Sequence, residues 1–237
     1  MIEKINLNNI LFLDIETVPE YHNYRGLDNE TQQLWEQKTQ YQRKDEVSAE
    51  DFYERAGIWA EFGKIITISV GYFVNKGDIR NFRVTSFWGD EKKILNDFSN
   101  LLNTHFNGAQ HVLCGHNAKE FDIPFIARRM IIKGIALPNK LNLFGKKPWE
   151  VPHLDTLELW KFGDYKHFTS LKLLTKVLGI PSPKDDIDGS EVAHVFYVED
   201  NIDRIITYCE KDVIAVAQIF LRLRREDLLI DDEIIHV

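Results

Sequence analysis

The chain has 237 residues, of which 44% are hydrophobic, and its formal net charge is -8 at pH 7. This length supports one sizeable core, and the sequence has no apolar run of membrane-spanning length and no N-terminal segment typical of a signal peptide. The only cysteines, Cys114 and Cys209, form no Cys-x-x-Cys pair. We therefore expect a single domain over residues 1–237, a cytoplasmic location and reduced cysteines.

The first predicted element is an apolar β-strand that begins at Ile10 and ends in the acids Asp14 and Glu16. Side chains two apart on a strand share a face, so these carboxylates project together. Their like charges repel unless a cation neutralises them, and oxygen ligands suit Mg²⁺ or Mn²⁺. Taken alone, the motif is weak, and two hydrated acids at a strand end are the simpler explanation.

A polar segment with scattered aromatic residues, residues 19–62, separates this strand from the next. It is far longer than a hairpin needs, and we predict a helical insertion. Its position after the acidic strand would allow it to cover a site there as a lid, but a purely structural helical pair fits the sequence as well.

The elements that follow predict an α/β fold. Strands are expected at residues 64–74, 81–87, 111–114 and 151–156, with a turn around residues 75–78, and helices at residues 91–106, 156–161, 170–178 and 190–198. Three strands in a meander followed by alternating helices and strands is the order of a ribonuclease-H-like fold. We expect a mixed five-stranded sheet flanked by helices.

The middle of the chain contains a strand, a loop and a helix, with Asn117, Phe121 and Asp122 in the loop and at the start of the helix. Pro124 fits the first helical turn, and Asp122 fits the N-cap, where the helix dipole favours an anion. Capping alone is a sufficient structural explanation of Asp122.

Apolar residues recur at helical spacing over residues 202–220, where Tyr208 and Asp212 share a face. An apolar turn follows Asp212, which places the acid near the core, and a buried acid is costly unless it is paired or bound to a metal. The alternative is a hydrogen bond from Asp212 to a neighbouring helix, with Tyr208 an ordinary tyrosine at the edge of the core.

In order and form, these segments resemble the DEDD superfamily of 3′-5′ exonucleases. The matching motifs are Asp14-Ile-Glu16, then Asn117 with Phe121-Asp122, and Tyr208 four residues before Asp212, which is the pattern of the tyrosine (DEDDy) branch. Residues 61–69 and 188–192 are similar to stand-alone bacterial proteins related to the proofreading exonuclease domain of family-B DNA polymerases. The resemblance covers nearly the whole chain.

The resemblance implies two divalent metal ions, Mg²⁺ or Mn²⁺, bound by four acids: Asp14, Glu16, Asp122 and Asp212. It implies hydrolysis of phosphodiester bonds at 3′ ends, which releases nucleoside 5′-monophosphates by a two-metal mechanism. Tyr208 would orient or deprotonate the attacking water. Orientation is favoured, because the ordinary pKa of tyrosine, near 10, makes it a poor base.

The same resemblance implies a substrate-binding set of Glu16, Thr17, Asn117 and Phe121. Glu16 would meet the terminal 3′-hydroxyl, and Phe121 would shape the pocket. Asn117 would either fix its loop or touch the terminal nucleotide. Single-stranded DNA is the expected substrate from the resemblance alone, and a lid formed by residues 19–62 would select such ends.

Other classes of function stay open at this stage. The chemistry is equally compatible with RNA, and an inactive module that binds nucleic-acid ends is a further alternative. A replication or repair partner is compatible with the resemblance but is not identified by the sequence. The net charge of -8 disfavours tight binding of long duplexes.

A local basic strip could hold a single strand while a base stacks on Trp149. Its members are Arg128, Arg129, Lys133, Lys140, Lys146 and Lys147. A solvated helix face with Trp149 packed under a loop is the alternative. His116, His153 and His167 lie outside the third motif and are expected in ordinary polar packing, and Asp155 is expected as a helix N-cap.

Overall fold

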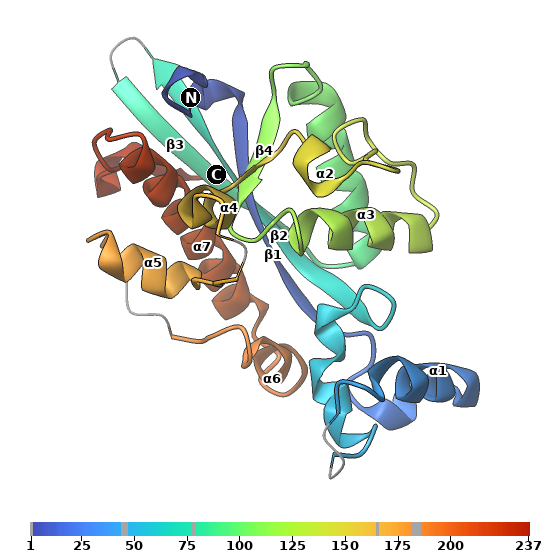
Figure 1. Ribbon diagram of the computed structural model, residues 1–237. Coiled ribbons are helices and arrows are strands. Elements are labelled where there is room, and N and C mark those ends of the chain that lie inside the picture. Colours follow the sequence, from blue (N-terminus) through green and yellow to red (C-terminus); the bar gives the residue numbers. More distant parts are fainter. Residues whose placement is uncertain (1, 44–46, 77–78, 165, 182–185) are drawn as a thin grey trace.

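The computed structural model describes residues 2–43, 47–76, 79–164, 166–181 and 186–237. Over these ranges, one mixed sheet has the strand order β5-β4-β1-β2-β3-β6 (Figure 1). The strands are β1 (Ile10–Pro19), β2 (Gly63–Lys76), β3 (Ile79–Trp88), β4 (Val112–Gly115), β5 (Leu154–Asp155) and β6 (Ile234–His236). β1, β2 and β3 form an antiparallel meander, β4 is parallel to both β1 and β5, and β6 is parallel to β3.

This arrangement confirms the ribonuclease-H-like α/β fold, with one correction to the number of strands. The sheet has a sixth strand, β6, which pairs with the segment from Phe82 to Val84 of β3. Three residues near the C-terminus are too few to produce a readable alternation of apolar and polar side chains. The turn expected around residues 75–78 extends outside the described residues.

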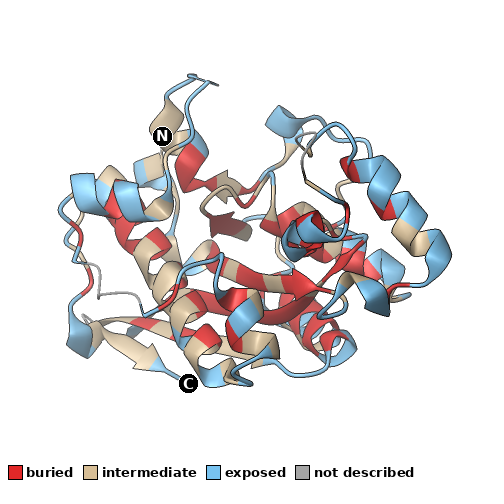
Figure 2. Cartoon of the chain, turned by 90° about the horizontal axis from the view of Figure 1, so that it is seen from below, coloured by how far each residue is buried: buried red, intermediate tan, exposed pale blue. Residues whose placement is uncertain are grey.

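The α-helices of the described residues are α1 (Asn29–Thr39), α2 (Glu91–His105), α3 (Asp122–Ile132), α4 (Thr156–Lys161), α5 (Leu171–Val177), α6 (Val192–Tyr197) and α7 (Ile202–Leu223). α2 and α3 cover one face of the sheet and α7 covers the other, whereas α1 packs outside the sheet. Figure 2 shows buried residues along the strands and on the inner sides of the helices. Within the described part of the chain, no helix is long and apolar enough to cross a membrane.

The alternation of side chains along β1 determines which helix each residue meets. Leu11, Leu13 and Ile15 pack in the core that α2 and α3 cover, while Ile10 and Phe12 pack against apolar residues of α7. Asp14 and Glu16 continue the alternation of Ile10 and Phe12. The two acids therefore lie on the α7 face of the sheet.

The segment between β1 and β2 contains α1 and two 3-10 helices, η3 (Tyr24–Gly26) and η4 (Asp51–Ile58). It has a small aromatic core of its own, centred on the fully buried Trp35, whose Nε1 donates to the Ala49 carbonyl at 2.8 Å. In Figure 1 this insertion lies beyond the shared end of β1 and β2.

Candidate active site

The acids of the first and second motifs meet through the backbone of β1. Asp122 Oδ1 accepts a hydrogen bond from the Ile15 N–H at 3.2 Å. β4 pairs with β1 only as far as Phe12, so the edge of β1 beyond that point is open to another partner. Asp122 is the first residue of α3, and the N-cap position belongs to Phe121. The capping explanation of Asp122 is therefore wrong, and its carboxylate instead bridges α3 to the acidic strand.

The third motif comes from α7. Cys209 on this helix donates a hydrogen bond through its thiol to Asp14 Oδ2 at 3.3 Å. Asp212, one turn later, is partly buried, and its charge acts on Asp14, Glu16 and Asp122. The structure thus brings together the four acids predicted from three distant segments.

Electrostatics at this point favour a bound cation. Burial, followed by the charges of neighbouring acids, holds the pKa of Asp14 and that of Glu16 well above their ordinary values. Burial also raises the pKa of Asp122 to about 7, with Asp155 and Asp212 adding to the effect. Four crowded carboxylates cannot all ionise cheaply without a counter-charge. The all-oxygen donor set fits Mg²⁺ or Mn²⁺.

Tyr208 is half-buried on α7 beside the apolar cluster that contains Val18 and Ile66. It also lines a small surface pocket with Arg204, Thr207 and Lys211 among its other lining residues. Tyr208 and Asp212 are one helical turn apart and therefore share a face of α7.

The loop before α3 is held by Asp155. Its carboxylate accepts from the backbone N–H of Asn117 at 2.9 Å, Lys119 at 3.0 Å and Leu157 at 2.9 Å. Asp155 is the N-cap of α4, as predicted, and it also anchors the loop. Asn117 has a φ of +62°, a conformation that asparagine tolerates well, and its carbonyl accepts from Phe121 N–H at 3.0 Å. These contacts favour the loop-fixing role of Asn117.

A groove of about 930 Å³ begins at the carboxylate cluster. Glu16, Thr17 and Phe121 line it, whereas Asn117 is absent from its described lining. The opposite walls come from the insertion, through His22, Glu54, Arg55, Gly57 and Ile58, and from the region of α6, through Gly189, Ser190, Ala193, His194, Tyr197 and Val198. Three of the four predicted substrate-binding residues therefore share one groove.

Hydrogen bonds attach both walls of the groove to β1. Thr17 Oγ1 donates to the Gly57 carbonyl at 2.7 Å, which ties the insertion to the strand. Tyr197 of α6 donates through its hydroxyl to the carbonyls of Pro19 and Glu20, at 2.5 and 3.2 Å. The insertion is thereby hydrogen-bonded to β1 where it forms a wall of the groove.

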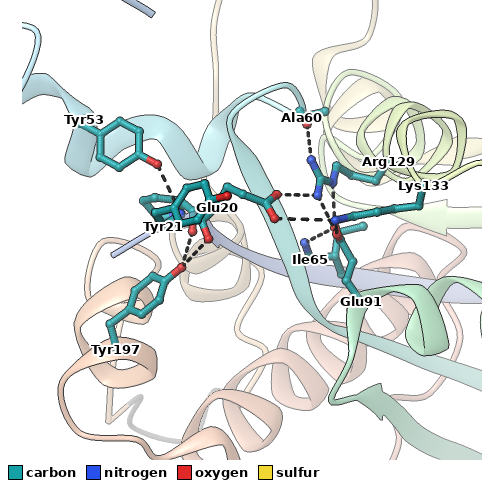
Figure 3. Close-up of polar contacts among 10 residues, drawn as sticks. Glu20, Tyr21, Tyr53, Ala60, Ile65, Glu91, Arg129, Lys133 and Tyr197 are labelled. Atoms are coloured by element: carbon teal, nitrogen blue, oxygen red, sulfur yellow. Dashed lines mark hydrogen bonds and ion pairs between the residues drawn. The ribbon is translucent and has the colours of Figure 1, made fainter. Parts of the chain in front are cut away.

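A buried ionic network fixes the same region from the other side (Figure 3). The Arg129 guanidinium, 2% exposed, donates to Glu91 Oε1 and Oε2 at 2.7 and 2.6 Å, and to Glu20 Oε2 at 2.7 Å. It also donates to the Ala60 carbonyl at 2.9 Å, and Lys133 Nζ lies 3.0 Å from Glu91 Oε2. Arg129 thus connects α3, α2, the end of β1 and the insertion.

These contacts remove part of the predicted basic strip from the surface. Arg129 and Lys133 are engaged by acids, and Lys140 Nζ donates to the carbonyls of Gly108 and His111. The six residues therefore do not form one continuous basic surface. Trp149 is 76% exposed, with Lys147 Nζ 5.4 Å from the centre of its ring, so packing under a loop is wrong.

His116 and His153 have the expected polar packing, whereas His167 does not. His116 bonds Thr156 Oγ1 and the Thr169 carbonyl, and His153 bonds the Leu113 N–H and the Lys140 carbonyl. Burial lowers the pKa of His153 to about 4, which keeps it neutral at physiological pH. His167 is exposed and lies 3.7 Å from Asp164.

Sequence reasoning missed the contact that Cys209 makes with the acids, because it classed this residue only as a reduced core cysteine. The available signal was spacing: Cys209 precedes Asp212 by three residues and so shares its helical face. One donor atom each from Asp14, Glu16 and Cys209 lie within 4.8 Å of one another.

A family of 3′-5′ exonucleases and several solved structures are similar to this chain. The model of a family described as "Predicted 3'-5' exonuclease related to the exonuclease domain of PolB" matches residues 58–233. The family-B DNA polymerase of the hyperthermophilic archaeon Pyrobaculum calidifontis shares the fold, with a TM-score of 0.51 and 15% identity over 90% of this chain. The match spans only 24% of that polymerase.

The RNase domain of the yeast Pop2 protein is a more distant structural match, with a TM-score of 0.45 and 13% identity. It covers 94% of this chain and 80% of that domain. No curated protein sequence matches the chain.

Proposed function

Because the chain belongs to the family of predicted 3′-5′ exonucleases related to the exonuclease domain of PolB, we propose that it removes nucleotides from the 3′ end of single-stranded DNA. The products would be nucleoside 5′-monophosphates. The observation that carries the proposal is the convergence of Asp14, Glu16, Asp122 and Asp212, whose charges act on one another in a buried site beside an open groove.

In this mechanism the four acids would hold two divalent cations. When bound, the cations lower the pKa of the attacking water and neutralise the charge that develops on the leaving 3′ oxygen. Tyr208 orients the water toward the phosphorus, an assignment that suits its place one turn before Asp212 on α7. Asp122 also positions the start of α3 against β1, because its carboxylate accepts a hydrogen bond from the Ile15 N–H.

The groove receives the end of the strand. Glu16 lies at the catalytic end and contacts the terminal 3′-hydroxyl, while Phe121 provides an apolar wall. Thr17 is engaged with Gly57, so its contribution to substrate binding is to hold the groove wall. The groove walls would reject a paired end on steric grounds, whereas a single strand enters.

The cellular setting belongs to the same proposal. Cys114 and Cys209 are both unpaired and buried, which suits the reducing cytoplasm. We propose a role in DNA repair or end trimming, or in proofreading together with a replication or repair partner.

The test is metal-dependent release of mononucleotides from 5′-labelled single strands of DNA and RNA. We expect a stepwise ladder with Mg²⁺ or Mn²⁺, more rapid on DNA, which EDTA abolishes. Asp14→Asn should abolish it, whereas Glu36→Gln, which removes one exposed charge from α1, should not. Faster cleavage of RNA would reassign the substrate, and no cleavage of either strand would reject catalysis.

A further inference from the structure

Cys209 places a sulfur atom among the acids of the candidate active site. Its thiol lies 3.3 Å from Asp14 Oδ2, and the donor atoms of Asp14, Glu16 and Cys209 all lie within 4.8 Å of one another. Cys209 is fully buried on α7, which packs against β1 and β2, so the packing of the helix on the sheet sets the position of the thiol. The set combines two carboxylates with one thiol, unlike the all-oxygen set that suits Mg²⁺.

The spacing of these atoms suits a tetrahedral ion with mixed ligands. Zinc binds carboxylate oxygen at about 2.0 Å and thiolate sulfur at about 2.3 Å, so the oxygen and sulfur of one tetrahedral site lie about 3.5 Å apart. The sulfur of Cys209 and the nearer oxygen of Asp14 already have this separation. A donor atom of Glu16 lies within 4.8 Å of both, which makes it the third ligand of such an ion.

We propose that Asp14, Glu16 and Cys209 form a site for a thiophilic divalent cation of the Zn²⁺ type. On binding, the thiol releases its proton to solvent and the thiolate coordinates the ion. Thiolate ligands select such cations over Mg²⁺, which prefers oxygen. Because the ion occupies two carboxylates assigned to the catalytic metals, it inhibits the nuclease. This inhibition rests on the proposed function, whereas the binding itself does not.

The second cysteine provides a matched control. Cys114 is also fully buried, but it lies on β4 in the apolar cluster with Ile10 and Phe12. Among the described residues, it belongs to no group of three metal-ligating side chains. The Cys114→Ser variant therefore keeps the proposed site and leaves Cys209 as the only thiol.

The binding test uses Co²⁺, whose coordination by a thiolate gives a charge-transfer absorption band in the near ultraviolet. Wild-type protein and Cys114→Ser should both show the band at about one ion per chain, and Cys209→Ser should lack it. A band that persists in Cys209→Ser, or its absence from the wild type, would overturn the proposal. Because Cys114→Ser has one thiol, its spectrum decides the question even if Cys209→Ser does not fold.

A second measurement tests the competition. Zn²⁺ is titrated into the Mg²⁺-dependent nuclease reaction, and the concentration giving half inhibition is compared between Cys114→Ser and Cys209→Ser. We expect Cys209→Ser to need at least ten times more Zn²⁺. Equal inhibition of both variants would contradict the inhibitory role, even if the cobalt band is present. If no nuclease activity exists, the cobalt spectra still test the site.

Discussion

The carboxylate of Asp122 accepts a hydrogen bond from the backbone N–H of Ile15, at a distance of 3.2 Å. Ile15 lies between Asp14 and Glu16, so this one bond sets the start of α3 against both acids of the first motif. The bond uses an N–H that β4 leaves open where its pairing with β1 ends. The end of a short strand thus becomes the place where two distant acidic motifs meet.

The first prediction concerns pH. The pKa of Asp122 is raised from 3.8 to about 7, and the pKa values of Asp14 and Glu16 are raised as well. Between about pH 4 and pH 7 the folded protein therefore holds protons that the unfolded chain has released, so stability falls as the pH rises. In EDTA, the Tm should be lower at pH 8 than at pH 5. A Tm that rises over this interval would contradict the assignment.

Asp122→Asn is the matched variant for that measurement. The amide oxygen can still accept from Ile15 N–H, but the side chain no longer titrates. The decline in Tm between pH 5 and pH 8 should become shallower. Mg²⁺ should raise the Tm of the wild type more at pH 8 than at pH 5, because the ion replaces the protons that crowded carboxylates otherwise retain.

A second prediction separates activity from stability at Asp14. In metal-free buffer at pH 8, Asp14→Asn should have a higher Tm than the wild type, because one of several mutually repelling buried carboxylates is gone. Its affinity for Mn²⁺, measured by calorimetry, should fall sharply. Glu36→Gln, an exposed change on α1, should alter neither quantity. A lower Tm in Asp14→Asn would show that its charge stabilises the metal-free fold.

The third prediction concerns the buried network at Arg129. Burial opposes the charged form of Glu91, but hydrogen bonds from Arg129 and from the Ile65 N–H hold its pKa below the ordinary value. Arg129→Met leaves that carboxylate buried without its main partner, and the free energy of unfolding should fall by about 3–5 kcal/mol. Urea denaturation provides the measurement. Arg128→Met, an exposed change at the adjacent position, should stay within about 0.5 kcal/mol.

The sequence predicted most of what is regular in this molecule. Alternation on β1 put Asp14 and Glu16 on one face of the strand, and helical spacing put Asp212 on one face of α7 with Tyr208, because each pattern reports a local backbone period. That the two elements face each other was expected only from the family resemblance. The β6 strand, the Arg129 network and the Cys209 contact depend on residues far apart in the chain. No local period encodes such pairings, and they follow only from the packed structure.

The insertion illustrates the same limit. Its aromatic residues predicted buried helices, but not whether those helices move. The bond from Thr17 to Gly57 and that from Arg129 to Ala60 join the insertion to other parts of the chain, and no local pattern in the sequence predicts either contact.

The fourth prediction tests orientation by Tyr208. Tyr208→Phe removes only the hydroxyl. We expect kcat to fall by about 10- to 100-fold with little change in KM. This decrease is small for the loss of a catalytic group, because a residue that only orients the water contributes less than a general base. If Tyr208 orients the water, the shape of the pH profile of kcat should persist in the variant. Loss of a titrating limb from that profile would instead assign Tyr208 as the base.

The last prediction concerns Gly115, at the end of β4. A Cβ at this position would meet the Ala118 Cβ at 2.5 Å and the Leu13 carbonyl oxygen at 3.0 Å, and neither atom is at the end of a flexible side chain. Gly115→Ala should therefore push the following loop away from β1, weaken the bond between Asp122 and Ile15, and cost about 1–3 kcal/mol in stability. Activity should fall by more than the unfolded fraction explains, because the shifted loop carries Asp122 away from the other acids. Gly108→Ala is the control, since its new Cβ would meet only the mobile end of Gln110, and it should leave both stability and activity nearly unchanged.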